Sequence, residues 1–271
     1  MKLLSIVFFI SFSLSALAAA DPKAQEVIKK FDIGYYRPQD RGLKELVLRV
    51  DIENLTKQLN EQLIFGKLNE VYFKLYWTLP LNVDVEVIGL PDGFTEIKQE
   101  LKAMIVSRFD LIVPQLLDNK FQGYAMKYNK GKEGDEIVST DTTQTKMIHE
   151  FVAKFDKEGN LSSLVGRKPM ATEESNLVYA KFPWSQNKWI VTSINVKMSD
   201  ATQTTLIDSE IEYTTVEGYG FPKMIKSKSK QTIQNGDKKP IERSFDSEMT
   251  FKDFKVNSGE AQTWLKKNKV P

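Results

Sequence analysis

The side chains in this sequence that could carry out chemistry are few. His149 is the single histidine of the chain, so a catalytic triad or a histidine metal site would need partners that the sequence does not present. The acid pairs Glu173–Glu174 and Glu210/Glu212 could transfer protons or hold calcium, but they lack the spacing of a calcium loop. We therefore predict that His149 is a sheet residue, that the acids are solvated charges, and that the chain has no catalytic and no metal-binding residue.

Longer functional motifs do not change this interpretation. The sequence has no glycine-rich phosphate loop, no G-x-S-x-G and no H-E-x-x-H segment. Its formal net charge of +2 gives no overall field that would attract nucleic acid. We expect a protein without a cofactor and without a nucleic-acid partner, and a hydrolase built from ordinary carboxylates remains an alternative.

Residues 1–20, with the sequence "MKLLSIVFFISFSLSALAAA", have the pattern of a secretory signal peptide. One positive charge at Lys2 precedes an apolar run, and small residues follow at Ala16, Ala18 and Ala20. The run is shorter than the roughly 20 apolar residues that a membrane-spanning helix needs. We predict cleavage after Ala18 or Ala20, a periplasmic or secreted protein, and no transmembrane segment after cleavage.

The remainder of the chain, residues 21–271, is predicted to be a single domain. The sequence contains no cysteine, so an exported chain of this kind must be held together by a buried core rather than by disulfides. About 250 residues are enough for one large core, and no linker rich in Pro, Gly or Ser divides them.

Periodicity predicts a mainly β protein with a few helices. Helical spacing occurs after Asp21-Pro22, from Glu53 to Gly66, and from Thr95 to about Asp118, where Pro114 should kink or end the helix. Period-two patterns predict early strands in "GLKELVLRVDI" and "NEVYFKLYWTLPLNVDVEV". Later strands are expected at Phe121–Asn129, Glu136–Thr140, Thr145–Asp156, Leu161–Gly166, Asn176–Trp184, Trp189–Met198, Thr204–Thr215, Lys223–Ile233 and Ile241–Val256. Their short polar connections favour an antiparallel meander.

The apolar stripes of one strand and one helix are the candidate ligand-binding residues. A large sheet with few helices must form a sandwich, close into a barrel, or curve round the helices and leave an apolar hollow. Core packing and a binding cavity are both compatible with these stripes. The candidate cavity residues are Phe73, Leu75, Trp77, Leu101, Met104 and Ile105.

Three lysines alternate with serines late in the chain, at Lys226, Lys228 and Lys230. Period two places the lysines on one side of a strand, and lysines along an exposed strand discourage edge-to-edge aggregation. We predict that they form the solvent face of a peripheral strand. The alternative is a contact surface for anionic lipid headgroups.

The C-terminal strands resemble those of the outer-membrane lipoprotein carrier family and its lipoprotein-sorting relatives. The similar segments are "YTTVEGYGFPKMIKSKSKQTI" and "SFDSEMTFKDFKVNSG", with matching positions at Gly220, Pro222, Ile225, Val256 and Asn257. The early order of signal peptide, short helix, strand "ELVLRV" and strand "VYFKLYW" is also similar. The resemblance implies a curved antiparallel sheet that forms an unclosed half-barrel, with helices packed on its concave face over a cavity for acyl chains.

Together these features predict an exported, non-catalytic carrier that binds a lipid, an acyl chain or a lipid-modified protein. A structural or interaction module that docks an envelope protein through its sheet is the main alternative.

Overall fold

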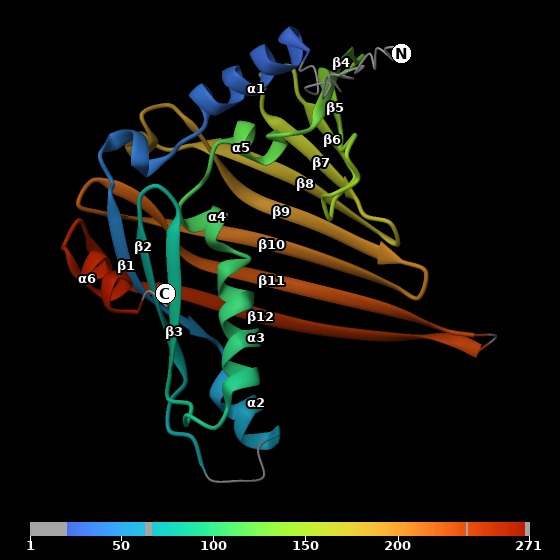
Figure 1. Ribbon diagram of the computed structural model, residues 1–271. Helices are drawn as coiled ribbons and strands as arrows, with labels where there is room; N and C mark the ends of the chain where they lie inside the picture. Colours follow the sequence, from blue (N-terminus) through green and yellow to red (C-terminus); the bar gives the residue numbers. More distant parts are fainter. Residues whose placement is uncertain (1–20, 63–66, 237, 269–271) are drawn as a thin grey trace, which may run out of the picture.

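The computed structural model describes residues 21–62, 67–236 and 238–268, and a single large sheet dominates it (Figure 1). The predicted signal peptide lies outside the described residues. The strands are β1 (Glu45–Ile52), β2 (Tyr72–Thr78), β3 (Asn82–Ile88), β4 (Ala125–Lys130), β5 (Asp135–Thr140), β6 (Glu150–Phe155), β7 (Leu161–Arg167), β8 (Ala171–Lys181), β9 (Trp189–Asp200), β10 (Gln203–Val216), β11 (Tyr219–Asn235) and β12 (Lys238–Val256).

These strands form one antiparallel sheet of 12 strands in the order β3-β2-β1-β12-β11-β10-β9-β8-β7-β6-β5-β4. From β4 to β12 each strand pairs with the next one in the sequence, as a meander does, and β12 then pairs with β1. The two ends of the order, β3 and β4, do not pair, so the sheet is open. The prediction of a mainly β, antiparallel and unclosed sheet is confirmed.

The helices are short and lie on both faces of the sheet. They are α1 (Pro22–Gly34), η1 (Pro38–Arg41), α2 (Leu55–Gln62), α3 (Thr95–Val106), α4 (Phe109–Ile112), α5 (Leu117–Phe121), η2 (Pro183–Ser185) and α6 (Glu260–Lys267). Figure 1 shows α1, α5, α4 and α3 following one another across one face, which we call the inner face. No helix in the described ranges has the length and apolar character that a membrane crossing requires.

The core lies between these helices and the inner face of the sheet. Strand β1 contributes Leu46, Leu48 and Val50, which alternate along the strand and are buried, while Ile28 of α1 and Ile105 of α3 cover the same cluster. Burying a side chain of this size contributes roughly 1.5–3 kcal/mol. Alternation in the strands thus selects the face that the helices cover.

The prediction of a single helix from Thr95 to Asp118 is wrong, because the chain forms three separate helices there, α3, α4 and α5. The hydroxyl of Ser107 donates to the carbonyl of Met104 at 2.7 Å, a local bond that competes with the helix ladder at the end of α3. Pro114 then separates α4 from α5, since proline has no N–H to continue a helix.

Two predicted strands begin later in the chain than expected. The strand expected from Thr145 begins at Glu150, so His149, predicted to be a sheet residue, lies just before it. The strand expected from Phe121 begins at Ala125, because Phe121 ends α5. The sequence did not predict α6, which packs on the opposite, outer face through Ala261, Trp264 and Leu265. The predicted end of α2 at Gly66 lies outside the described residues.

Candidate ligand-binding site

The six predicted cavity residues lie in one apolar cluster on the inner face. Phe73, Leu75 and Trp77 of β2 and Ile105 of α3 are 0% exposed, and Leu101 and Met104 are half-buried against the same cluster. The structure therefore brings the predicted strand stripe and helix stripe together. Three pockets of the described chain, of about 710, 600 and 460 Å³, have other linings, and the hypothesis that the six residues line a cavity remains a prediction.

Trp77 carries the one polar atom of this group, and that atom has no partner. Its indole Nε1 is buried and makes no hydrogen bond to any described residue. The indole packs against Phe109 of α4, with ring centroids 6.3 Å apart. A buried N–H donor without an acceptor costs about 1–3 kcal/mol, so this position has an unused hydrogen-bond donor in an apolar surrounding.

The far ends of β9–β12 extend past the helices, so their inner face is not covered there (Figure 1). Register identifies which side chains share this face: Ile194 pairs with Ser209, which pairs with Ser227, and the core residue Ile225 is two positions from Ser227. The same alternation places a set of apolar side chains along the uncovered ends, and we call this set the inner strip. It consists of Ile194, Val196, Met198, Ile207, Ile241 and Phe245.

The inner strip is apolar and accessible at the same time. Phe245 is 53% exposed and Ile241 is 43% exposed, while Ile194, Val196 and Ile207 are half-buried. Between them lie Ser209 and Ser227, which hydrogen-bond to each other at 2.8 Å, and the exposed Arg243, which shares this face between Ile241 and Phe245 on β12. At about 3.3 Å per residue, the part of β9 that carries the strip is roughly 13 Å long.

Sequence reasoning missed the inner strip as a site. The sequence shows the alternation of Ile194, Val196 and Met198 with polar residues. It does not show that the helices cover only part of the inner face of the sheet. The lengths of β11 and β12, 17 and 19 residues, were the available signal, because a helix of a few turns cannot cover strands of that length.

The outer face of the same strands is charged. Lys226, Lys228 and Lys230 are exposed, as predicted, but β11 lies between β10 and β12 and is not peripheral. The prediction of a peripheral strand was wrong: it was based on the serines between the lysines, which suggested a weak inner face, but Ser227 and Ser229 are buried, at 6% and 8% exposure. The lysine ammonium of Lys226 lies 3.3 Å from Glu212 and that of Lys230 lies 3.1 Å from Glu242.

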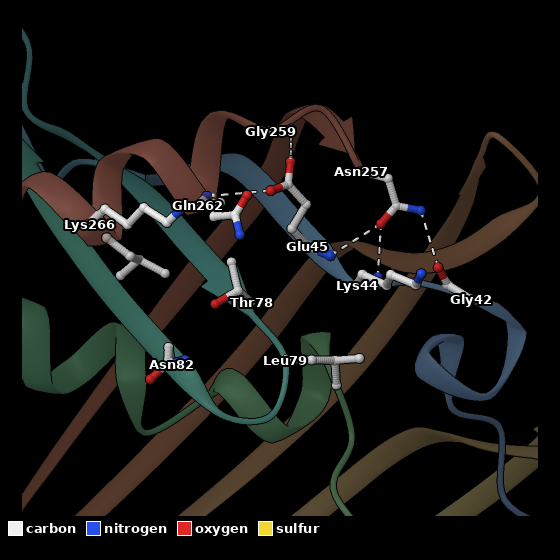
Figure 2. Close-up of a pocket in the computed structure, with 11 residues that line it drawn as sticks. Gly42, Lys44, Glu45, Thr78, Leu79, Asn82, Asn257, Gly259, Gln262 and Lys266 are labelled. Carbon is white, nitrogen blue, oxygen red and sulfur yellow. Dashed lines mark hydrogen bonds between the residues drawn. The ribbon is translucent and has the colours of Figure 1, made fainter.

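A pocket of about 710 Å³ lies on the other side of the molecule, where α6 begins (Figure 2). Its buried carboxylate, Glu45, accepts hydrogen bonds from the backbone N–H groups of Gly259 and Gln262. Asn257 accepts from the backbone N–H groups of Lys44 and Glu45 at 2.8 and 3.2 Å. These groups cap a helix and fix a turn, so their polar atoms are already used in holding the fold together.

A second pocket, of about 600 Å³, lies between α1 and the segment that follows α4. Asp32 is buried there and accepts from the backbone N–H groups of Leu117 at 2.7 Å and Asp118 at 3.2 Å. Burial raises the pKa of Asp32, although these two hydrogen bonds act in the opposite direction. Since both bonds join α1 to α5, the carboxylate has a structural role.

The other residues considered for chemistry are scattered. His149 lies in the connection before β6, and the two acid pairs lie on β8 and β10. Within the described residues, no group of His, Asp and Glu side chains has the arrangement of a metal site.

Comparison with known proteins found no matching family model, no curated protein and no solved structure.

Proposed function

We propose that this protein is an exported, non-catalytic carrier that binds the acyl chain of a lipid or of a lipid-modified protein, and that the chain lies along the inner strip. The observation that carries the proposal is the contrast between the two halves of the inner face. One half is apolar and covered by helices, and the other half is uncovered and carries the apolar inner strip, with Arg243 as a charged residue among its members.

The chemistry of the strip favours an acyl chain. Val196, Ile207 and Phe245 lie in one register row across β9 to β12, with Ser229 between the last two, and Ile194 extends this apolar contact along β9. Removing apolar surface from water contributes roughly 25 cal/mol per Å², so a flexible apolar chain would gain from covering the strip. The charged outer face offers no such surface.

Export is part of the proposal and rests on the pattern of residues 1–20. A carrier outside the cytoplasm would move an apolar molecule through water, and a one-sided apolar face on a stable sheet suits that task.

The proposal is tested by native mass spectrometry of the protein purified from its own cell envelope. We expect an added mass that corresponds to an acyl species. A bare mass, together with failure to bind a fluorescent fatty acid in vitro, would contradict the carrier proposal and favour a module that docks a protein through its sheet.

A matched pair of variants locates the binding site. Ile207 points to the inner strip, and its neighbour Leu206, which is exposed, points to the outer face. We expect Ile207→Asn to weaken fatty-acid binding by roughly tenfold, because it places an amide on the apolar contact. Leu206→Asn should bind as the wild type does. Equal affinity of both variants would place the ligand elsewhere.

A further inference from the structure

The turns at one end of the meander share an unusual surface. The connections β5–β6, β7–β8, β9–β10 and β11–β12 all lie at the same end of the sheet, because successive strands are antiparallel. Figure 1 shows the last three of these turns along one margin, with the β11–β12 hairpin extending furthest. We call this margin the rim.

Each rim connection, or the strand end beside it, exposes a large apolar side chain. Met147 in β5–β6 is 79% exposed and Met170 in β7–β8 is 82% exposed, the two highest values among the large apolar residues of the described chain. Met198 beside the β9–β10 turn and Ile241 beside the β11–β12 turn are also exposed. At the opposite end, the turns β4–β5, β6–β7, β8–β9 and β10–β11 expose no large apolar side chain themselves, and among the described strand ends beside them Val178 of β8 is the exposed one, at 59%.

A cationic side chain accompanies each of these apolar residues in the sequence. Lys146 precedes Met147, and Lys197 precedes Met198. In the two remaining turns, Lys168 lies two positions before Met170, and Lys239 lies two positions before Ile241.

We propose that the rim is a membrane-contact surface, whose apolar side chains enter the boundary between the headgroups and the acyl chains of a bilayer. Apolar side chains flanked by lysines suit this boundary, because the apolar part is buried among lipid chains while the ammonium remains with the headgroups. Methionine is flexible and adapts to a fluid surface.

The arrangement favours a bilayer over a protein partner. The apolar groups come from separate turns along a margin, whereas the core of a protein interface is a contiguous and closely packed patch. The inner strip also reaches this margin, since Met198 and Ile241 belong to both. A bilayer at the rim would therefore lie beside the end of the strip.

The test uses residues of the rim that are outside the inner strip, so that it is independent of ligand binding. We compare flotation of the wild type and of Met147→Ser/Met170→Ser with vesicles of phosphatidylcholine, with and without phosphatidylglycerol. The matched control is Leu79→Ser/Leu81→Ser, because these leucines are 45% and 50% exposed at the opposite end of the sheet.

We expect the wild type and the control to float, more strongly with phosphatidylglycerol, and the rim variant to lose roughly tenfold in vesicle partitioning. Equal flotation of the rim variant and the wild type would overturn the proposal, and so would a wild type that remains unbound. A wild type that ignores vesicles but self-associates through Met147 and Met170 would instead assign the rim to a protein contact.

A label gives a second readout that does not depend on a destabilising change. The chain has no cysteine, so Met147→Cys can carry a single environment-sensitive fluorophore, with Leu79→Cys as the control. Vesicles should shift the emission of the label at 147 to shorter wavelength and leave the label at 79 unchanged. The same shift at both positions, or at neither, contradicts a specific role for the rim. Fatty-acid binding is measured on both labelled proteins without vesicles. If both bind the fatty acid, the carrier proposal holds even when the label at position 147 detects no membrane contact.

Discussion

The indole of Trp184 lies directly on the backbone of Gly220, and a Cβ atom at position 220 would overlap the ring. The backbone N–H of Gly220 donates to the hydroxyl of Tyr36 at 2.8 Å. Tyr36 in turn meets Trp184 edge to face, with ring centroids 5.2 Å apart. This contact joins the segment after α1, the β8–β9 connection and the start of β11, so it fixes the helices against the sheet.

Replacing Gly220 by alanine should therefore destabilise the fold. The added methyl group must displace the indole of Trp184 or the strand, and overpacking of this kind costs about 1–3 kcal/mol. Gly93→Ala is the control, because a Cβ atom at Gly93 would meet nothing within 4 Å. Chemical denaturation measures both changes. Equal stability of the two variants would show that Trp184 moves away without cost.

Trp77→Ala should lower the free energy of unfolding by about 3–5 kcal/mol, because the indole is 0% exposed in the core cluster. Trp77→Phe should cost less, since phenylalanine keeps most of the apolar contact and removes the N–H that has no partner. Thermal unfolding and fatty-acid binding are measured on both variants. Weak binding by Trp77→Ala with little loss of stability would instead support the predicted cavity around Phe73, Leu75 and Trp77.

Periodicity predicted the sheet well because each strand of the meander carries its own alternation and its own turn. Periodicity did not predict which part of the inner face the helices cover, because that part depends on where α3 ends. Ser107 and Pro114 stop the helical segment early, and a helical pattern does not show how far a helix reaches across a sheet. The short α6 was missed since only Ala261, Trp264 and Leu265 form its apolar face.

Glu45→Gln should loosen α6. The carboxylate accepts from the backbone N–H groups of Gly259 and Gln262, as Figure 2 shows. It also accepts from the hydroxyl of Ser258, so it neutralises the positive end of the helix. A neutral amide keeps one acceptor oxygen and loses the charge, at a cost of about 1 kcal/mol. Hydrogen exchange should become faster in residues 260–267 and stay unchanged in α1. Unchanged exchange in α6 would show that its packing on Tyr76 suffices.

Asp141 should contribute stability that is lost in acid. Hydrogen bonds from the Thr143 hydroxyl and from the backbone N–H of Lys146 lower the pKa of Asp141 to about 2, against an ordinary value of 3.8. Because the folded pKa is depressed, the contribution is complete above about pH 4 and disappears as the pH falls to about 2. Asp141→Asn should therefore reduce the melting temperature at neutral pH, and the difference from the wild type should shrink toward pH 2. A difference that is constant with pH would contradict this assignment.

Neutralising the lysines of the outer face should leave membrane contact unchanged. Lys226 and Lys230 already face Glu212 and Glu242, and Lys228 pairs in register with Asp208 and Asp246, so the lysines act within a mixed charge surface. Exposed ion pairs contribute about 0–1 kcal/mol each, and salt screens them. The Lys226/Lys228/Lys230→Gln variant should lose on the order of 1 kcal/mol of stability at low salt, and less at high salt. In the flotation experiment it should behave as the wild type does, unlike the Met147→Ser/Met170→Ser variant. A salt-sensitive loss of flotation in the lysine variant would show that β11 meets anionic headgroups with its outer face.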